Sequence, residues 1–152
     1  MGAENNIWKR SDSALVVVDY TSLDELKKYR EAIRNVGINV NNCSLLAVVP
    51  TKKERLIMNQ QSLAVFISEK DINLLGQLKN PEAQNILKQK FSLLIMIGDK
   101  PKRLSKVLMQ LNVDTSIGLN CTINEQDVNL KTEVATPSHL INFAKQTLEK
   151  II

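Results

Sequence analysis

The sequence predicts a single α/β domain in which helices cover both faces of a mostly parallel β-sheet, a three-layer αβα sandwich. Short apolar runs rich in β-branched residues alternate with segments whose apolar residues recur at helical spacing. Such an alternation forms βαβ crossovers, which are right-handed in nearly all proteins and make the strands parallel. The 152 residues contain no repeat and no linker rich in Gly, Pro or Ser. We therefore expect a lead-in over residues 1–12, which Trp8 pins to the domain, and one domain over residues 13–152.

The predicted strands are short apolar runs bounded by turn residues. The strongest covers residues 91–97, and the run over residues 14–20 is typical of a strand buried on both faces. Whether residues 38–40 join the next strand or form one of their own stays open. The other predicted strands are residues 44–49, 63–68 and 116–119, and residues 122–132 form a polar loop or edge.

The predicted helices begin at capping residues. Ser22 and Glu25 form a capping-box pattern, and Gly37 ends the helix that follows. Proline favours the first helical position, because an N–H would be unpaired there. We therefore expect helices from Pro81 to about Lys90, from Pro101 to Leu111 and from Pro137 to Ile151. Residues 51–59 suggest a helical turn, and residues 69–79 fit a short helix or an irregular extended stretch equally well.

Composition and charge argue against several classes of protein. No apolar run approaches the ~20 residues that cross a bilayer, so we expect no membrane partner. Residues 1–10 lack the apolar centre of a secretory signal, and Cys43 and Cys121 are too few for a disulfide framework, so we expect a cytoplasmic protein. The net charge of +4 comes from scattered basic residues with few aromatics, which argues against a nucleic-acid partner.

The carboxyl ends of parallel strands share one edge of a sheet, and ligands of open α/β sheets bind there. Asp19 ends the first strand, where it would bind a ligand or cap the following turn. The turn after the strand at residues 91–97 combines a glycine with three cations, which suits a phosphate or carboxylate, although a solvated turn explains it too. The candidate ligand-binding residues are therefore Asp19, Gly98, Asp99, Lys100, Lys102 and Arg103.

The chain offers no complete set of catalytic or metal-binding residues. His139 is the only histidine, which leaves one base for a triad and excludes sites that need two His ligands. Cys121 follows a strand, where it would be a reactive thiol or a small core or rim residue, and we favour the second interpretation because no basic partner is evident. Neither a P-loop nor a Gly-rich dinucleotide fingerprint is present. We predict no catalytic residue, no metal site and no cofactor.

Two segments carry a family resemblance. Residues 70–76 (KDINLLG) and 90–95 (KFSLLI) resemble an uncharacterised family of bacterial α/β domain proteins, typified by a KD-(L/I)-N-W-F-G segment and a later F-D-L-L-I strand. This chain differs in having Leu74 and Leu75 in place of aromatics and Ser92 in place of Asp. The resemblance implies a cytoplasmic bacterial protein with a Rossmann-like sandwich, and it implies no substrate.

Two functions stay open on the sequence alone. The first is a non-catalytic binding or interaction domain with an unknown protein partner or with itself, because no base, nucleophile and oxyanion donor can be assembled. The second is an enzyme or sensor that binds a small phosphorylated or carboxylated ligand at the carboxyl edge of the sheet, using Asp19 and the turn over residues 98–103.

Overall fold

The structure, a computed structural model, describes residues 6–37, 42–51, 64–122 and 126–151. Its centre is a six-stranded sheet in the order β3-β2-β1-β4-β5-β6, in which every neighbouring pair is parallel. The strands are β1 (Ala14–Asp19), β2 (Cys43–Val48), β3 (Val65–Ile67), β4 (Lys90–Ile97), β5 (Asn112–Leu119) and β6 (Val128–Leu130). This is the doubly wound order of Rossmann-like folds, so the predicted fold class is confirmed.

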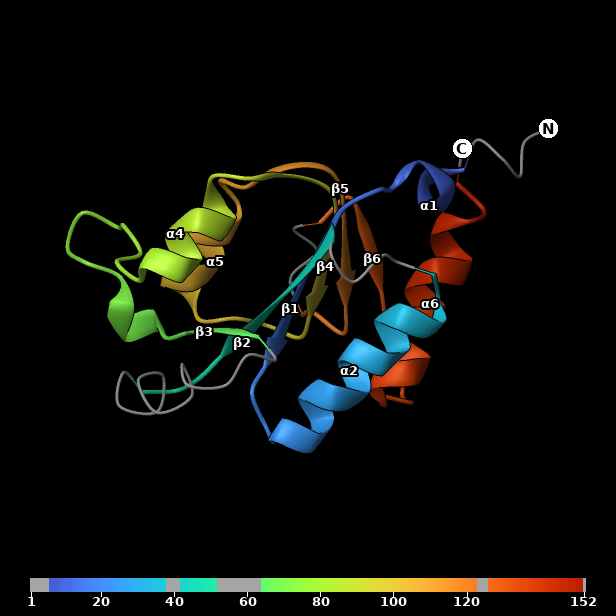
Figure 1. Cartoon of the computed structure of the whole chain (residues 1–152), viewed down its shortest axis with the longest axis horizontal. Helices are drawn as coiled ribbons and strands as arrows, with labels where there is room; N and C mark the ends of the chain where they lie inside the picture. Colours follow the sequence, from blue (N-terminus) through green and yellow to red (C-terminus); the bar gives the residue numbers. More distant parts are fainter. Residues whose placement is uncertain (1–5, 38–41, 52–63, 123–125, 152) are drawn as a thin grey trace.

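Helices cover the sheet on both sides (Figure 1). On one face lie α2 (Leu23–Asn35) and α6 (Pro137–Leu148), and on the other lie α4 (Pro81–Leu87) and α5 (Lys102–Leu108). The short α1 (Ile7–Arg10) sits beside α6, where Ile7 N donates to Ile151 O at 2.8 Å and Trp8 packs against the core. None of the helices in the described ranges combines the length and apolar character needed to cross a bilayer.

The helix starts follow the predicted caps. Ser22 Oγ accepts from Glu25 N at 3.1 Å, and Gly37 ends the segment with φ +91°. Asn80 and Thr136 cap α4 and α6 through their side chains, each followed by a proline. Pro101 differs from the prediction: its ψ of 142° is extended, so it is the N-cap and α5 begins one residue later.

Element boundaries differ from the predictions where pairing with a neighbour decides them. α4 ends at Leu87 rather than near Lys90, because β4 begins at Lys90. β5 begins at Asn112 rather than residue 116, because pairing with β4 extends a polar, partly exposed stretch into the sheet. Residues 69–71 form the 3-10 helix η3 (Glu69–Asp71). β6 lies inside the stretch predicted as a polar loop or edge, and it is an edge strand of the sheet. The predictions for residues 38–40 and 52–59 lie outside the described residues.

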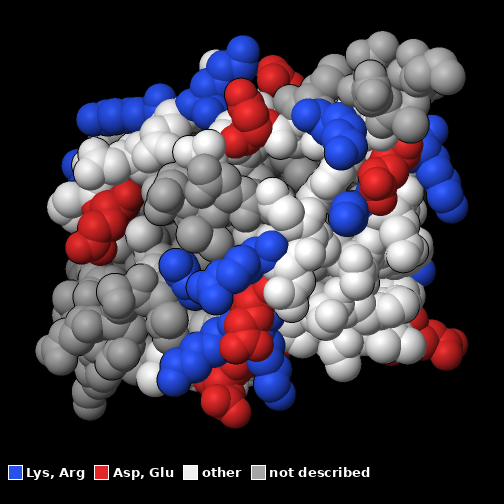
Figure 2. Space-filling model, turned by 45° about the vertical axis from the view of Figure 1, so that its right-hand side comes forward, with Lys and Arg blue, Asp and Glu red and all other residues white. Residues whose placement is uncertain are grey.

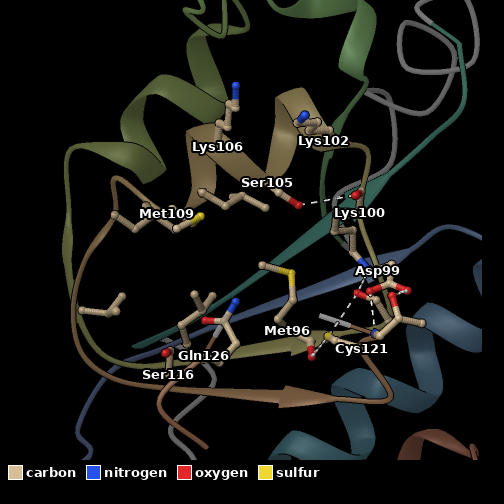
Figure 3. Close-up of a pocket in the computed structure, with 16 residues that line it drawn as sticks. Met96, Asp99, Lys100, Lys102, Ser105, Lys106, Met109, Ser116, Cys121 and Gln126 are labelled. Carbon is tan, nitrogen blue, oxygen red and sulfur yellow. Dashed lines mark hydrogen bonds between the residues drawn. The ribbon is translucent and has the colours of Figure 1, made fainter. Parts of the chain in front are cut away.

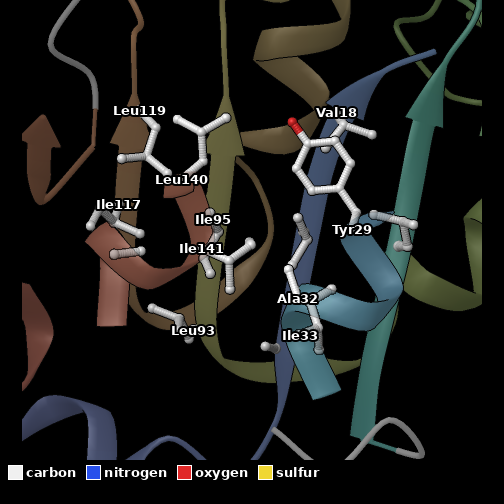
Figure 4. Packing of buried hydrophobic residues seen from close by; sticks show 14 of the residues in the cluster. Val18, Tyr29, Ala32, Ile33, Leu93, Ile95, Ile117, Leu119, Leu140 and Ile141 are labelled. Atoms are coloured by element: carbon white, nitrogen blue, oxygen red, sulfur yellow. The ribbon is translucent and has the colours of Figure 1, made fainter. Parts of the chain in front are cut away.

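The face under α2 and α6 is closed by a continuous apolar core (Figure 4). Alternate residues of β1 point to opposite faces, so Val16 and Val18 join this core while Leu15 and Val17 join the one under α4 and α5. All four are at most 1% exposed. Burial on both faces explains why β1 is a continuous apolar run rather than an alternating one.

The other face is covered less completely, because the connection from β5 to β6 is short. It spans residues 120–127, whereas a crossover between parallel strands usually takes a dozen residues or more, including a helix. A right-handed crossover here would place that helix beside α5, because both steps run in the same direction across the sheet. Beyond α5, no helix of the described residues lies on this face of β5 and β6.

Candidate functional site

The space beside α5 is a cavity of about 750 Å³ between that helix and strands β4 and β5 (Figure 3). We call it the α5 cavity. It runs from the carboxyl ends of the two strands, at Gly98 and Thr122, to the beginning of β5, at Val113. Its apolar walls consist of Leu94, Met96, Leu108, Met109, Leu111 and Val113. Met109 is 61% exposed and stands at the open side, whereas Met96 is buried.

Small residues on β5 leave this space open. Ser116 lines the cavity where its neighbour on β4 is Leu94. Next along the same face, Gly118 lies so close to Gln126 that an added Cβ would approach its Cγ to 3.1 Å. Gln126 therefore packs over Gly118, and its side chain lines the cavity near Ser116 and Met96 (Figure 3). Larger side chains at these β5 positions would reduce the room beside α5.

The carboxyl edge of the sheet is built around the buried ammonium group of Lys100. Its side chain is fully buried, and Nζ donates to the carbonyl oxygens of Ile97 and Gly98, the latter at 3.0 Å. Asp19 Oδ1 lies 3.6 Å from Nζ, and the Asp19 side chain is 55% exposed. Burial lowers the pKa of Lys100, while the Asp19 carboxylate opposes that shift. Gly98 adopts φ +76°, which favours glycine at this turn.

A second contact joins the loops after β4 and β5. The Asp99 carboxylate accepts hydrogen bonds from the backbone N–H and the hydroxyl group of Thr122, both at 2.8 Å. These bonds lower the pKa of Asp99. Asn120 adopts φ +59°, and its Oδ1 accepts from Thr132 N at 2.8 Å. Hydrogen bonds within the chain therefore fix the conformation of the loops at the polar end of the α5 cavity.

Cys121 lies at that polar end. Its Sγ is 3.5 Å from Gly98 O and 3.9 Å from Met96 O. Burial raises the pKa of the thiol, although the charge of Lys100 acts in the opposite direction. The thiol is therefore protonated at neutral pH, which suits a packing residue better than a nucleophile. His139 lies on α6, across the sheet, where its Nε2 is 3.1 Å from Thr132 Oγ1.

The structure brings only part of the predicted anion site together. Asp19, Gly98, Asp99 and Lys100 meet at the carboxyl edge, and Lys102 lines the α5 cavity. Arg103 instead turns to the loop after η3, where its Nη2 donates to Ile72 O at 3.3 Å and Asn73 O at 2.8 Å. Two of the three predicted cations, Lys100 and Arg103, thus bind backbone oxygens of the chain.

The apolar part of the α5 cavity is not evident from the sequence. Leu94 and Met96 lie in the strand predicted over residues 91–97, Ser116 begins the strand predicted over residues 116–119, and Gln126 lies in the predicted polar loop or edge. Two signals could have found them. Alternate residues of β4 face α5, and the polar stretch after residue 119 is too short to hold a helix before another strand.

A family model described as "Family of unknown function (DUF6913)" matches residues 2–151. The chain belongs to this family. Among solved structures, the D-arabinose dehydrogenase from Sulfolobus solfataricus is similar with 13% identity and a TM-score of 0.42. That match covers 92% of this chain and 45% of the dehydrogenase, so the chain spans less than half of that protein. No curated protein matches the sequence.

In this DUF6913 chain, charged side chains are mixed on the surface. Figure 2 shows Lys and Arg beside Asp and Glu on the displayed face rather than a broad area of one sign. The described residues contain no group of three or more His, Cys, Asp or Glu that could hold a metal ion. The α5 cavity is therefore our candidate binding site among the described residues.

Proposed function

We propose that this chain is a non-catalytic binding domain whose α5 cavity takes a small ligand with an apolar body and one carboxylate. The observation that carries the proposal is the size and lining of the cavity, about 750 Å³ with apolar walls beside a few polar groups. Small-molecule sites in proteins are usually concave, mostly apolar and roughly 300–1,000 Å³ in volume. The elongated shape, polar at the strand ends and apolar at the start of β5, favours a ligand with the same polarity along its length.

The cations at the cavity favour a single negative charge. Lys102 and Lys106 line it from α5, and neither has a salt-bridge partner within the described part of the chain. Figure 3 shows both side chains extending from α5 away from Cys121, toward the outer side of the helix. A phosphate group is usually held by several cations or N–H donors, and here Lys100 and Arg103 already bind the chain itself. A carboxylate carries only one negative charge, so a single cation such as Lys102 at the rim is enough to bind it.

The non-catalytic part of the proposal is supported by the polar groups around the cavity. The Cys121 thiol contacts carbonyl oxygens, and Asp99 is bonded to Thr122. Base, nucleophile and oxyanion donor are not combined among them. We place the domain in the cytoplasm, in keeping with two cysteines that form no disulfide.

Binding of decanoate tests the proposal, because it joins an apolar chain to one carboxylate. We expect isothermal titration calorimetry to show saturable binding below the micelle concentration, with weaker binding of decanol and none of inorganic phosphate. The midpoint of thermal unfolding should rise with the logarithm of the decanoate concentration once this exceeds Kd.

A matched pair of variants locates the ligand. Met109 and Val134 are both exposed apolar residues, 61% and 51%, but only Met109 lines the cavity. Met109→Glu should weaken decanoate binding about ten-fold or more, because a glutamate carboxylate would replace an apolar contact with the decanoate chain and prefers water. Val134→Glu should leave it unchanged. Absence of decanoate binding, or equal loss in both variants, contradicts the proposal.

A further inference from the structure

Two polar side chains, Ser116 and Gln126, lie in the apolar stretch of the α5 cavity. We call them the polar pair. Figure 3 shows them near each other and near Met96, with the Gln126 amide group directed into the cavity. Ser116 is 7% exposed, and Gln126 is partly buried. Polar groups in an apolar wall cost free energy unless they form hydrogen bonds, so the partners of this pair bear on what the cavity binds.

The side chains of the polar pair have hydrogen-bonding capacity to spare. Gln126 forms its hydrogen bonds in the described part of the chain through its backbone: N donates to Asn129 Oδ1 at 3.4 Å, and O accepts from Asn129 Nδ2 at 2.7 Å. Its side-chain amide has no partner among the described residues. Ser116 Oγ accepts from Asp127 N at 3.0 Å, and its O–H has no acceptor among them. The pair therefore offers donors and an acceptor to a ligand.

The chain fixes Gln126 in its place beside the sheet. Its two bonds to Asn129 hold its backbone on one side. On the other side, the neighbouring Asp127 is joined to Ser116 by two hydrogen bonds, since Ser116 N also donates to Asp127 Oδ2 at 2.9 Å. Gln126 Cγ packs over Gly118. The amide therefore has little freedom left to lose when it binds a ligand.

The polar pair lies midway along the cavity. Gly98, at the carboxyl end, is level with Leu119, because Gly98 N donates to Leu119 O at 2.8 Å. On β5, Ser116 lies midway between Leu119 and Val113, which marks the other end of the cavity. With a rise of roughly 3.3 Å per residue, each of these two intervals is about 10 Å. A ligand that fills the cavity therefore passes the pair with the middle of its chain, whichever end enters first.

We propose that the ligand of the α5 cavity is a hydroxylated carboxylic acid whose hydroxyl group lies in mid-chain and binds Gln126 and Ser116. This inference rests on the proposed function and names its ligand class. A hydroxyl group can donate to Gln126 Oε1 and accept from the O–H of Ser116. A keto oxygen only accepts, so it would leave Oε1 unpaired. A plain alkyl chain would leave both side chains unpaired, which costs affinity.

A positional series of hydroxydecanoates, from 2-hydroxydecanoate to 10-hydroxydecanoate, tests the inference by isothermal titration calorimetry. We expect an internal position to bind about ten-fold more tightly than decanoate, because its hydroxyl group pairs with side chains that decanoate leaves unpaired. Hydroxyl groups near either end of the chain do not reach the polar pair, so these acids should bind no more tightly than decanoate. The oxodecanoate with its ketone at the best position should bind less tightly than the hydroxy acid.

A conservative variant tests the role of the amide. Gln126→Met removes the amide but retains a flexible side chain of similar length. It should abolish the preference for the hydroxy acid over decanoate, whereas a merely structural role would weaken both ligands equally. Decanoate itself should bind as tightly as before or more so, because no amide is then left unpaired. Gln89→Met, at an exposed glutamine outside the cavity, should keep the preference of the unaltered chain.

A second measurement needs no variant. In the unaltered chain, the side-chain amide resonances of Gln126 report directly on a hydrogen bond to the ligand. At saturation, the best hydroxy acid should shift these resonances more than decanoate does. Equal shifts with both ligands would contradict the inference.

The outcomes separate this inference from the proposed function. If neither decanoate nor any hydroxydecanoate binds, the proposed function is wrong, and so is this inference. If decanoate binds but no hydroxydecanoate binds more tightly, the cavity takes a ligand that does not pair with Gln126, and only this inference is wrong. The same holds if the preference persists in Gln126→Met, or if the oxo acid binds more tightly than the hydroxy acid.

Discussion

The two faces of the sheet differ in how completely helices cover them. Under α2 and α6, residues of β1, β4 and β5 pack into one cluster that Leu140 and Ile141 of α6 cover (Figure 4). Under α4 and α5, a second cluster packs well beneath the helices but gives way to the α5 cavity along β5. Side chains therefore fill the space under α2 and α6, whereas a cavity remains beside α5 on the opposite face of the sheet.

The difference comes from the connection after β5 and from the small residues, Ser116 and Gly118, that β5 turns to the α4–α5 face. β4 supplies apolar side chains to both faces, yet beyond α5 no helix of the described residues lies on the α4–α5 face of β5 and β6. Close packing is what stabilises a domain, and an unfilled apolar wall is what binds a ligand. We therefore assign stability mainly to the α2–α6 face and binding to the α4–α5 face, and the following predictions test that division.

The largest expected effect separates two leucines of equal burial. Leu140 is 1% exposed in the α2–α6 face, and Leu108 is 2% exposed but lines the cavity. We expect Leu140→Ala to lower the free energy of unfolding by about 3–5 kcal/mol and Leu108→Ala by about 2–3 kcal/mol, because a side chain beside a void loses fewer contacts. Urea denaturation measures both. Equal losses would mean that the α5 cavity does not loosen its face.

A smaller effect is expected at the polar edge of the open face. Asp19→Asn leaves the buried Lys100 ammonium with carbonyl partners alone, which should lower the free energy of unfolding by about 1–2 kcal/mol, since Asp19 is partly exposed. In a Lys100→Met background the same change should cost less. A double-mutant cycle by urea denaturation gives the coupling, and a coupling of zero would show that the two groups do not interact.

On the α2–α6 face, the thiol of Cys43 makes the free energy of unfolding depend on pH in the alkaline range. Burial raises the pKa of Cys43 from 9.0 to about 11, while Arg30 acts against that shift. Between pH 9 and 11 the unfolded thiol loses its proton while the folded one retains it, so stability is complete below pH 9 and falls as pH rises. We expect Cys43→Ala to lose about 1–2 kcal/mol less stability than the unaltered chain between pH 8.5 and 10.5. Parallel losses in guanidinium melts would contradict this.

The smallest effect is expected at the opening of the cavity. Met109→Glu and Val134→Glu both alter exposed side chains, so each should change the free energy of unfolding by less than about 0.5 kcal/mol. Binding and stability are then separable at Met109. If Met109→Glu unfolds the domain, Met109 supports the open face, and its loss of decanoate binding would not locate a ligand.

The sequence predicted the fold better than the site, for a physical reason. Strands such as residues 14–20 and caps such as Ser22 and Asn80 are local signals, and the structure contains them. The α5 cavity depends on how short the connection between β5 and β6 is and on which neighbours Leu94 and Ser116 face, and these are relations between distant segments. Arg103 makes the same point: its charge was evident, but its partners at Ile72 and Asn73 lie some 30 residues away.

In the proposed function, a ligand enters the cavity beside α5 and reaches the sheet. Methyl-labelled methionine spectra test this directly, because Met109 stands at the opening and Met96 is buried on β4 at the wall of the cavity. We predict that decanoate shifts both methyl resonances together and saturably, with one dissociation constant, and that Met109→Glu suppresses the shift of Met96. A Met96 resonance that stays unchanged at saturating decanoate would show that decanoate does not enter the α5 cavity.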